Sequence, residues 1–195
     1  MAKQGKQKIT LAETKADFRR QIRKKLKTQS EASRIKKSEA VIKKLKEDPD
    51  FRKSNSFMVY VSTEEEVRTR SLLELLLQAG KCVTVPFVEP KTNELIAVEV
   101  MDFYQDLIPG RFGILEPRPD IVAPFNLDDL DIVLVSGLAF DKKNFRLGRG
   151  KGYYDRFLKR LSPRTKTYGL AFDFQVFKAI PVALHDEKVD KVITN

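Results

Sequence analysis

The residues best suited to chemistry lie together in residues 137–156, which read GLAFDKKNFRLGRGKGYYDR. Three glycines alternate with two cations, and Asp155 follows shortly after them. Glycines at alternate positions let the backbone turn its N–H groups inward, which forms a concave anion-binding nest at the start of a helix. The cations would add full positive charge, and the carboxylate could hold a magnesium ion carried by the same phosphates. The pattern therefore predicts a phosphate site at Gly148, Arg149, Gly150, Lys151 and Gly152.

The common phosphate-binding motifs do not describe this segment. Lys151 is followed by a glycine and not by Ser or Thr, which excludes a Walker A loop. The glycines also come too late in the chain for a dinucleotide fingerprint. His185 is the single histidine, so a histidine-based metal site or catalytic dyad has little support. The alternative is a flexible turn with solvated cations. A binding site is favoured by the polar and aromatic residues on either side, which are Asp141, Arg146 and residues 153–155.

A strand must deliver this segment and a helix must follow it. Residues 130–135 form an apolar, β-prone run, and residues 154–161 read as a short helix that ends at Ser162-Pro163. Near the start of the chain, apolar residues at a spacing of four predict a helix over residues 11–27 with Lys15 and Arg19 on one cationic edge. Residues 28–31 (TQSE) are typical of a capping box that opens a second helix.

A strand–helix–strand unit follows these helices. Residues 57–61 are predicted to form a buried strand. The polar run STEEEVRT (62–69) is expected to open a helix that ends at Gly80. Residues 82–86 are predicted to form the next strand. This order favours a right-handed crossover with parallel strands. The glutamates at 64–66 then lie at the carboxyl end of the first strand, which is where ligands bind in open α/β sheets.

The order of elements predicts one fold class. Strands alternate with helices, and no repeat, low-complexity linker or composition break divides the chain. We therefore expect one domain over residues 1–195, a three-layer α/β/α arrangement with a largely parallel sheet. No apolar run approaches the ~20 residues that a membrane helix needs.

The positive charge is concentrated at the N-terminus. Residues 1–53 hold 18 Lys and Arg against 7 Asp and Glu, whereas the remaining residues hold 19 against 20. Residues 1–9 are expected to form a disordered basic tail, which lacks the apolar core of a signal peptide. Cys82 is the single cysteine, so we expect no internal disulfide and a cytoplasmic location. The basic segment leaves open a nucleic-acid-binding protein as an alternative.

The string RLGRGKGYYD, preceded by GLAFD, closely resembles the signature of the 5-formyltetrahydrofolate cyclo-ligase family, also called the 5,10-methenyltetrahydrofolate synthetases. The resemblance extends over nearly the whole chain, through KADFRR (15–20), STEEEVRT (62–69), FGILEP (112–117) and KVDKV (188–192). One departure is Asn144, which stands where many relatives have glycine and is expected to supply a left-handed turn. The fold implied is a three-layer α/β domain, loosely similar to ribose-phosphate isomerases and CoA transferases.

The resemblance implies an ATP- and magnesium-dependent enzyme that converts 5-formyltetrahydrofolate into 5,10-methenyltetrahydrofolate, ADP and phosphate. Phosphorylation of the formyl oxygen makes it a leaving group, the neighbouring nitrogen closes the ring, and phosphate departs. Such phosphoryl transfer depends mainly on positioning and charge neutralisation. The implied partners are a reduced folate and ATP, with no nucleic acid and no membrane, and we expect a monomer. A second alternative, a sugar-phosphate isomerase or CoA transferase-like enzyme, would not consume ATP.

The resemblance also implies roles for individual residues. Lys15 and Arg19 would reach the nucleotide phosphates, and Asp155 and Asp190 would hold magnesium. Val61 and Glu66 would line the pterin side, with Glu65 as the alternative within the glutamate triplet. The nucleotide would also meet Arg146, Leu147, Gly148, Arg149, Gly150, Lys151, Gly152, Tyr153 and Tyr154. Of these, Arg149, Gly150, Lys151, Gly152 and Tyr153 would touch the folate as well, and Arg149, Lys151 and Tyr153 would be catalytic.

Overall fold

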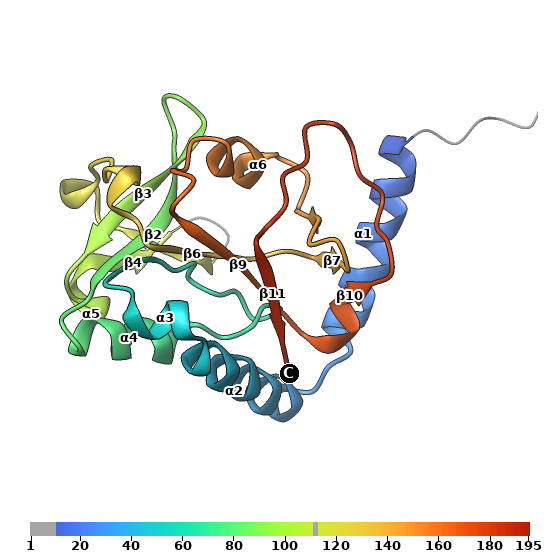
Figure 1. The fold of residues 1–195 in the computed structure, drawn as a ribbon, viewed down its shortest axis with the longest axis horizontal. Coiled ribbons are helices and arrows are strands. Elements are labelled where there is room, and N and C mark those ends of the chain that lie inside the picture. Colours follow the sequence, from blue (N-terminus) through green and yellow to red (C-terminus); the bar gives the residue numbers. More distant parts are fainter. Residues whose placement is uncertain (1–10, 111–112) are drawn as a thin grey trace, which may run out of the picture.

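A six-stranded mixed sheet forms the centre of the computed structural model, which describes residues 11–110 and 113–195 (Figure 1). The strand order is β11-β9-β6-β1-β2-β3, and every neighbouring pair is parallel except the hairpin β2–β3. The parallel sheet predicted from the strand–helix–strand pattern is therefore confirmed. The strands are β1 Ser56–Met58, β2 Cys82–Glu89, β3 Glu94–Val100, β6 Ile132–Val135, β9 Lys166–Ala171 and β11 Lys191–Thr194.

The direction of winding reverses between β1 and β6. From β1 the chain proceeds to β2 and β3 on one side, and from β6 it proceeds to β9 and β11 on the other. Such a reversal opens a crevice at the carboxyl ends of the two central strands, and α/β sheets bind ligands there. The segments that leave β1 and β6 carry the glutamate triplet and the glycine-rich string, respectively.

Helices cover both faces of the sheet, as the three-layer prediction requires. Alternate strand residues face opposite ways, so Phe57, Ile132 and their neighbours pack with α1, α2 and α4, whereas Met58 and Val133 pack with Phe157 of α6. Figure 1 shows α2, α3 and α4 on one face and α6 on the other. The helices are α1 Leu11–Lys27, α2 Glu31–Glu47, α3 Pro49–Lys53, α4 Arg70–Gln78 and α6 Tyr153–Leu158.

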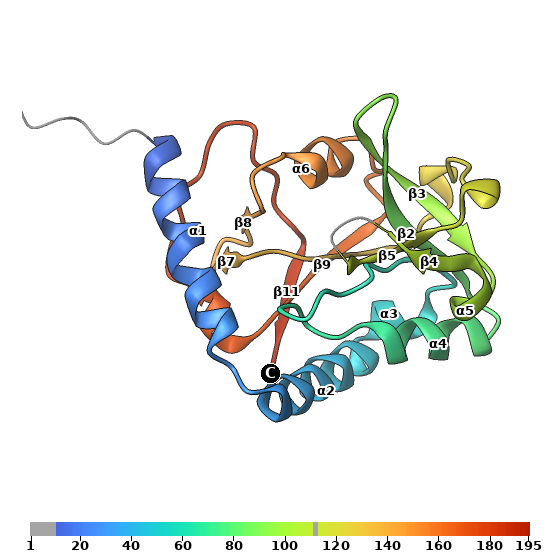
Figure 2. The ribbon, with the colours of Figure 1, turned by 180° about the vertical axis from the view of Figure 1, so that it is seen from behind.

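A second, three-stranded sheet connects α1 to the rest of the molecule. It consists of β7 Ala139–Asp141, β8 Arg146–Leu147 and β10 Val176–Phe177, in the order β10-β7-β8. Figure 2 shows α1 lying along this sheet. The contact is fixed by Phe18, whose ring meets that of Phe177 edge-on at 4.9 Å between centroids. The basic first helix is therefore held next to the segment that contains the glycine-rich string.

The remaining short elements lie at the rim of the main sheet. A two-stranded antiparallel sheet pairs β4 with β5, and α5 precedes it. Among the described residues, no helix is long and apolar enough to cross a membrane. These elements are α5 Phe103–Asp106, β4 Leu107–Pro109, β5 Leu115–Pro117 and the 3₁₀ turns Pro119–Ile121, Leu127–Asp129 and Asp173–Gln175.

Several local predictions are confirmed. Helix α1 spans Leu11–Lys27 as expected, and Asn144 has the left-handed conformation, with φ of 65°. Gly80 also has positive φ, 68°, one residue beyond the C-cap of α4. The expected disordered tail, residues 1–9, lies outside the described residues, as does Phe112 of the FGILEP string.

Four local predictions were wrong in their boundaries. The cap of α2 is Ser30, whose hydroxyl accepts from the Ser33 N–H, so the helix starts two residues later than the proposed capping box. Residues 62–69 form a loop instead of a helical turn, and α4 starts only at Arg70. Strand β1 ends at Met58 although its apolar run continues to residue 61, and α6 ends at Leu158. For α2 and for residues 62–69, side-chain hydrogen bonds outweighed the local propensity.

Candidate active site

The glutamate loop, residues 59–69, leaves the carboxyl end of β1 and is braced from within. The Tyr60 hydroxyl donates to the Val67 carbonyl at 3.0 Å, and the Thr69 hydroxyl donates to the Tyr60 carbonyl at 2.5 Å. Tyr60 and Val67 are buried, whereas Val61 is half-buried and packs against the core. This bracing fixes the loop at the edge of the crevice.

Glu66 joins the glutamate loop to the glycine-rich loop, residues 148–152. Its Oε1 accepts from Arg149 Nη2 at 3.0 Å, and its Oε2 accepts from the Thr63 N–H at 2.9 Å and the Thr63 hydroxyl at 3.1 Å. Arg149 Nη2 also donates to Thr63 Oγ1 at 3.3 Å. Of the three consecutive glutamates, Glu66 is therefore the one that contacts the glycine-rich loop. Which of Glu66 and its alternative Glu65 contacts the pterin is a separate question, and the assignment to Glu66 stays a prediction.

Two of the three glycines have conformations that side chains resist. Gly150 and Gly152 have φ of 111° and 66°, and both values lie in the region that favours glycine. Gly148 leaves room for Arg146, because an added Cβ would lie 2.5 Å from Nη1 and the guanidinium would have to shift. Leu147 is buried and pairs with Ala139 in the small sheet, so the loop starts from a fixed point.

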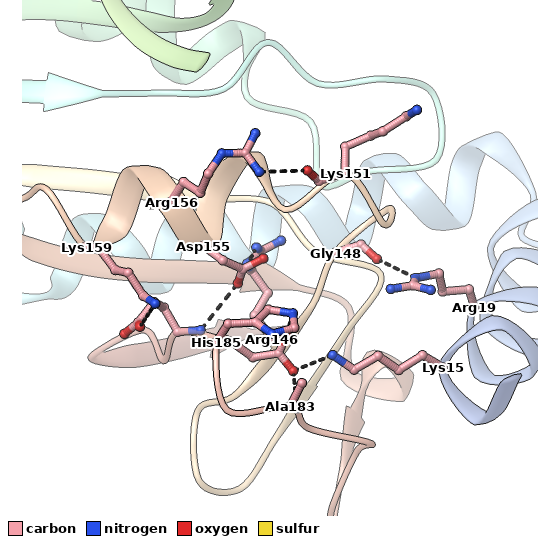
Figure 3. A network of polar contacts seen from close by, with 12 residues as sticks. Lys15, Arg19, Arg146, Gly148, Lys151, Asp155, Arg156, Lys159, Ala183 and His185 are labelled. Carbon is pink, nitrogen blue, oxygen red and sulfur yellow. Dashed lines mark hydrogen bonds and ion pairs between the residues drawn. The ribbon is translucent and has the colours of Figure 1, made fainter. Parts of the chain in front are cut away.

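Both arms of the glycine-rich loop are held by arginines. Arg19 of α1 donates from Nε to the Gly148 carbonyl at 2.9 Å, and Arg156 of α6 donates to the Lys151 carbonyl at 3.1 Å (Figure 3). The Lys151 side chain extends away from these contacts, and the residue is exposed. The predicted convergence of the first helix on the glycine-rich string is therefore present in the structure.

Arg146 lies beneath the loop. The residue is 5% exposed, and its Nη2 donates to Asp155 Oδ1 at 3.1 Å. Its guanidinium also lies 5.2 Å from the ring centroid of Tyr154, and burial followed by the nearby Glu66 charge raises the pKa of the Tyr154 hydroxyl. Arg146 therefore supports the loop from below, and the loop itself carries two exposed cations, Lys151 and the Glu66-bound Arg149.

Lys15, the other predicted phosphate contact of α1, is also fixed. The residue is 8% exposed, and its Nζ lies 2.5 Å from Asp186 Oδ2. Tyr153, which follows the glycine-rich loop, donates from its hydroxyl to Asn93 Oδ1 at 2.8 Å. Asn93 is at the turn of the β2–β3 hairpin, so the hairpin tip reaches the site.

The predicted magnesium ligands, Asp155 and Asp190, each keep one carboxylate oxygen without a protein donor among the described residues. Asp155 Oδ1 accepts from Arg146 and from the Glu187 N–H, and Asp190 Oδ2 accepts from the Thr167 N–H and hydroxyl. Residues 11–110 and 113–195 contain no group of three or more His, Cys, Asp or Glu side chains suited to a metal. Magnesium typically takes one or two carboxylates from a protein, and the assignment of these two residues to it stays a prediction.

A cleft of about 890 Å³ opens beside the glutamate loop. Val61, Thr63 and Glu64 line it from this loop, and Phe103 and Leu115 line it from the rim elements. The predicted pterin residue Val61 therefore borders a cavity large enough for a small molecule. Thr63, through its contacts with Glu66 and Arg149, connects this cleft to the glycine-rich loop.

Three residues of the site were missed by the sequence analysis. Thr63, Asn93 and Asp186 contact Glu66, Tyr153 and Lys15, respectively. Thr63 lies within the polar run that was singled out, so it carried a weak signal. Asn93 and Asp186 lie in a hairpin turn and a loop distant in sequence from their partners, and no local pattern identifies them.

Comparison with known proteins places the chain in a family. The family model of the 5-formyltetrahydrofolate cyclo-ligases matches residues 11–195. The mouse 5-formyltetrahydrofolate cyclo-ligase is 30% identical, with 95% of each chain covered, and a probable 5-formyltetrahydrofolate cyclo-ligase of Caenorhabditis elegans is 32% identical, covering 94% of this chain and 93% of its own.

Solved structures agree with this match. The structure of Aquifex aeolicus 5,10-methenyltetrahydrofolate synthetase is 37% identical, with a TM-score of 0.80 over 92% of this chain and 88% of its own. The Mycoplasma pneumoniae synthetase, 24% identical with a TM-score of 0.73 over 92% and 98%, shows the same fold. The chain therefore belongs to the 5-formyltetrahydrofolate cyclo-ligase family and is an enzyme of the ligase class.

Proposed function

We propose that this enzyme uses Mg-ATP to cyclise 5-formyltetrahydrofolate to 5,10-methenyltetrahydrofolate, releasing ADP and phosphate. The observation that carries the proposal is the contact of Arg149 with Glu66, because it joins a cationic glycine-rich loop to a carboxylate at the switch point of the sheet. ATP, the phosphate donor, and the pterin ring, which carries hydrogen-bond donors, would then lie side by side. The reaction needs this arrangement, since one substrate phosphorylates the other.

The chemistry explains why a nucleotide is required. A formamide oxygen is a poor leaving group, and transfer of the γ-phosphoryl group onto this oxygen converts it into a phosphate ester of an imidic acid. The neighbouring nitrogen of the folate attacks the activated carbon, and a new C–N bond closes the ring. The C–O bond then breaks as phosphate departs, and the attacking nitrogen releases its proton. Arg149 and Lys151 neutralise charge on the phosphoryl group during transfer.

The nucleotide side of the site is built from α1 and the glycine-rich loop. Lys15 and Arg19 approach from the helix, and the loop N–H groups approach from the other side, with Leu147 and Tyr154 holding its two ends. Asp155 and Asp190 would hold magnesium, which supplies further charge neutralisation on the phosphates. Tyr153, anchored by Asn93, would meet the folate at the end of the loop.

The pterin side is built from the glutamate loop. A carboxylate pairs well with the amino and amide N–H groups of a pterin ring, because it accepts hydrogen bonds on both oxygens. Glu66 presents such a carboxylate, held by Thr63, and Val61 lines the adjacent cleft. Entry of the folate would replace the Arg149 contact, which frees the guanidinium to face the phosphates.

A direct assay tests the proposed reaction. The purified chain, incubated with 5-formyltetrahydrofolate, ATP and Mg²⁺, should produce the near-ultraviolet absorbance of the methenyl product. Omission of ATP or addition of a chelator should abolish it. A folded protein that gives no absorbance rise would refute the proposal. Turnover without ATP would instead favour an isomerase or transferase-like activity, and salt-sensitive binding to random DNA without turnover would favour the nucleic-acid alternative.

Replacing Glu66 by glutamine should weaken folate binding. The charged acceptor is lost while the shape is kept, so KM for 5-formyltetrahydrofolate should rise at least about tenfold, whereas KM for ATP should change little. The exposed Glu99 of β3, which does not line the cleft beside the glutamate loop, offers a control, since Glu99→Gln should leave both constants unchanged. Steady-state kinetics with each substrate varied in turn measures the effect. Equal changes in KM for 5-formyltetrahydrofolate and KM for ATP would show that Glu66 supports the glycine-rich loop and does not bind the pterin.

We also propose that the enzyme acts in the cytoplasm as a monomer. The single cysteine, Cys82, fits a reducing compartment. Light scattering coupled to size exclusion measures the mass directly, and a dimer mass would overturn the second part of the proposal.

A further inference from the structure

Asp186, a carboxylate outside the family string, lies inside the nucleotide side of the site. Its side chain is 9% exposed, and its Oδ2 accepts from Lys15 Nζ at 2.5 Å and from the Ala183 N–H at 2.6 Å (Figure 3). The Lys15 side chain is itself only 11% exposed. Burial opposes ionisation of Asp186, but the Ala183 N–H and the Lys15 ammonium outweigh it and lower the pKa of the carboxyl group.

The same short loop contacts two parts of the site. Asp186 binds Lys15 of α1 through its side chain, and the next residue, Glu187, donates its N–H to Asp155 of α6 at 3.3 Å. Two consecutive residues therefore hold the cation proposed for the phosphates and a carboxylate proposed for magnesium. Lys15 and Asp186 are 171 positions apart in the chain, so the contact exists only in the folded protein.

A buried Lys–Asp pair is an inefficient way to stabilise a fold. Taking both charges out of water costs free energy that their attraction only partly offsets, and apolar residues of similar size would serve as well. The pair does achieve one thing that apolar residues cannot, since it holds an ammonium group in one place. An ammonium carries three N–H donors, so the bond to Asp186 leaves donors for a phosphate.

We propose that Asp186 is a positioning residue of the nucleotide site, and that its carboxylate holds the Lys15 ammonium where it meets phosphate oxygens of ATP. The inference deepens the proposed function and rests on it for the identity of the ligand. The competing explanation is that the pair only anchors α1 to the fold.

Asp186→Asn tests the proposal, because the amide oxygen can still accept from the Ala183 N–H while the charge is lost. The variant should raise KM for ATP, and Kd for a non-hydrolysable ATP analogue measured by calorimetry, at least about tenfold. KM for 5-formyltetrahydrofolate should stay at the wild-type value. In a Lys15→Met background the same change should add nothing, since the two residues would act as one unit.

A matched pair elsewhere provides the control. Lys37 of α2 contacts Asp173 at 2.8 Å, with side chains 28% and 56% exposed. Asp173→Asn removes the same kind of charge from an inter-element pair away from the glycine-rich loop, and it should leave KM and Kd for the nucleotide unchanged.

The outcomes separate the two explanations. A lowered melting temperature with wild-type nucleotide Kd in Asp186→Asn would make the pair an anchor only and overturn the inference. A further loss of affinity in the Lys15→Met background would overturn it as well. If the wild-type enzyme bound the analogue but formed no methenyl product, the proposed reaction would fail, and the effect of Asp186→Asn on Kd would still decide the role of Asp186.

Discussion

Replacing Lys151 by alanine should lower kcat/KM of the proposed reaction by at least about 100-fold, which is the range seen when one charge-stabilising group is removed. Lys151 lies between Gly150 and Gly152, whose positive φ values shape the loop, and its backbone carbonyl is held by Arg156. The exposed side chain adds its charge to a loop that already has a fixed position. The substitution should therefore weaken the stabilisation of the transferred phosphoryl group and leave the fold unchanged.

The size of this effect can be separated from a change in stability. The free energy of unfolding of Lys151→Ala should lie within about 0.5 kcal/mol of the wild-type value, because substitutions of exposed residues away from special contacts rarely change it by more. Lys36 of α2 is an exposed lysine of the same type, and Lys36→Ala should keep wild-type kinetics. Product absorbance and denaturant unfolding provide the two measurements. Wild-type kcat/KM in Lys151→Ala would show that the phosphates bind elsewhere.

Much of the layout could be predicted because its signals are local. The spacing of Phe18, Ile22 and Leu26 determines one face of α1, and that face packs against the core as expected. The parallel order of β1 and β2 followed from a strand–helix–strand pattern. The glycine-rich loop could be predicted because alternating glycines indicate a backbone that adopts positive φ. Gly150 and Gly152 do have positive φ in the structure.

The parts that could not be predicted depend on contacts between distant segments. Nothing near Asp186 in the sequence indicates that α1 will deliver Lys15 to it, and nothing near Asn93 indicates Tyr153. The position of β6 beside β1, which creates the switch point, is likewise a property of the whole sheet. The helix start after β1 was placed too early for a more local reason, because hydrogen bonds of Tyr60 and Thr69 within the loop hold residues 62–69 outside a helix.

Replacing Asp155 by alanine should reduce the free energy of unfolding by about 3 kcal/mol or more, the cost of leaving one member of a buried ion pair without its partner. The Arg146 side chain is 4% exposed, and Asp155 is 14% exposed. The pair of Asp17 with Arg20 on α1 is the control, since its side chains are 54% and 78% exposed and Asp17→Ala should cost about 0.5 kcal/mol or less. Denaturant unfolding measures both changes.

A double variant then separates the ion pair from the proposed magnesium ligand. Arg146→Met in the Asp155→Ala background removes the unpaired charge, so a large part of the lost stability should return. Activity should not return with it at any Mg²⁺ concentration, because the carboxylate is still absent. If stability and activity both returned in the double variant, the only role of Asp155 would be to support Arg146. If Asp155→Ala had wild-type stability, Arg146 would not depend on this carboxylate.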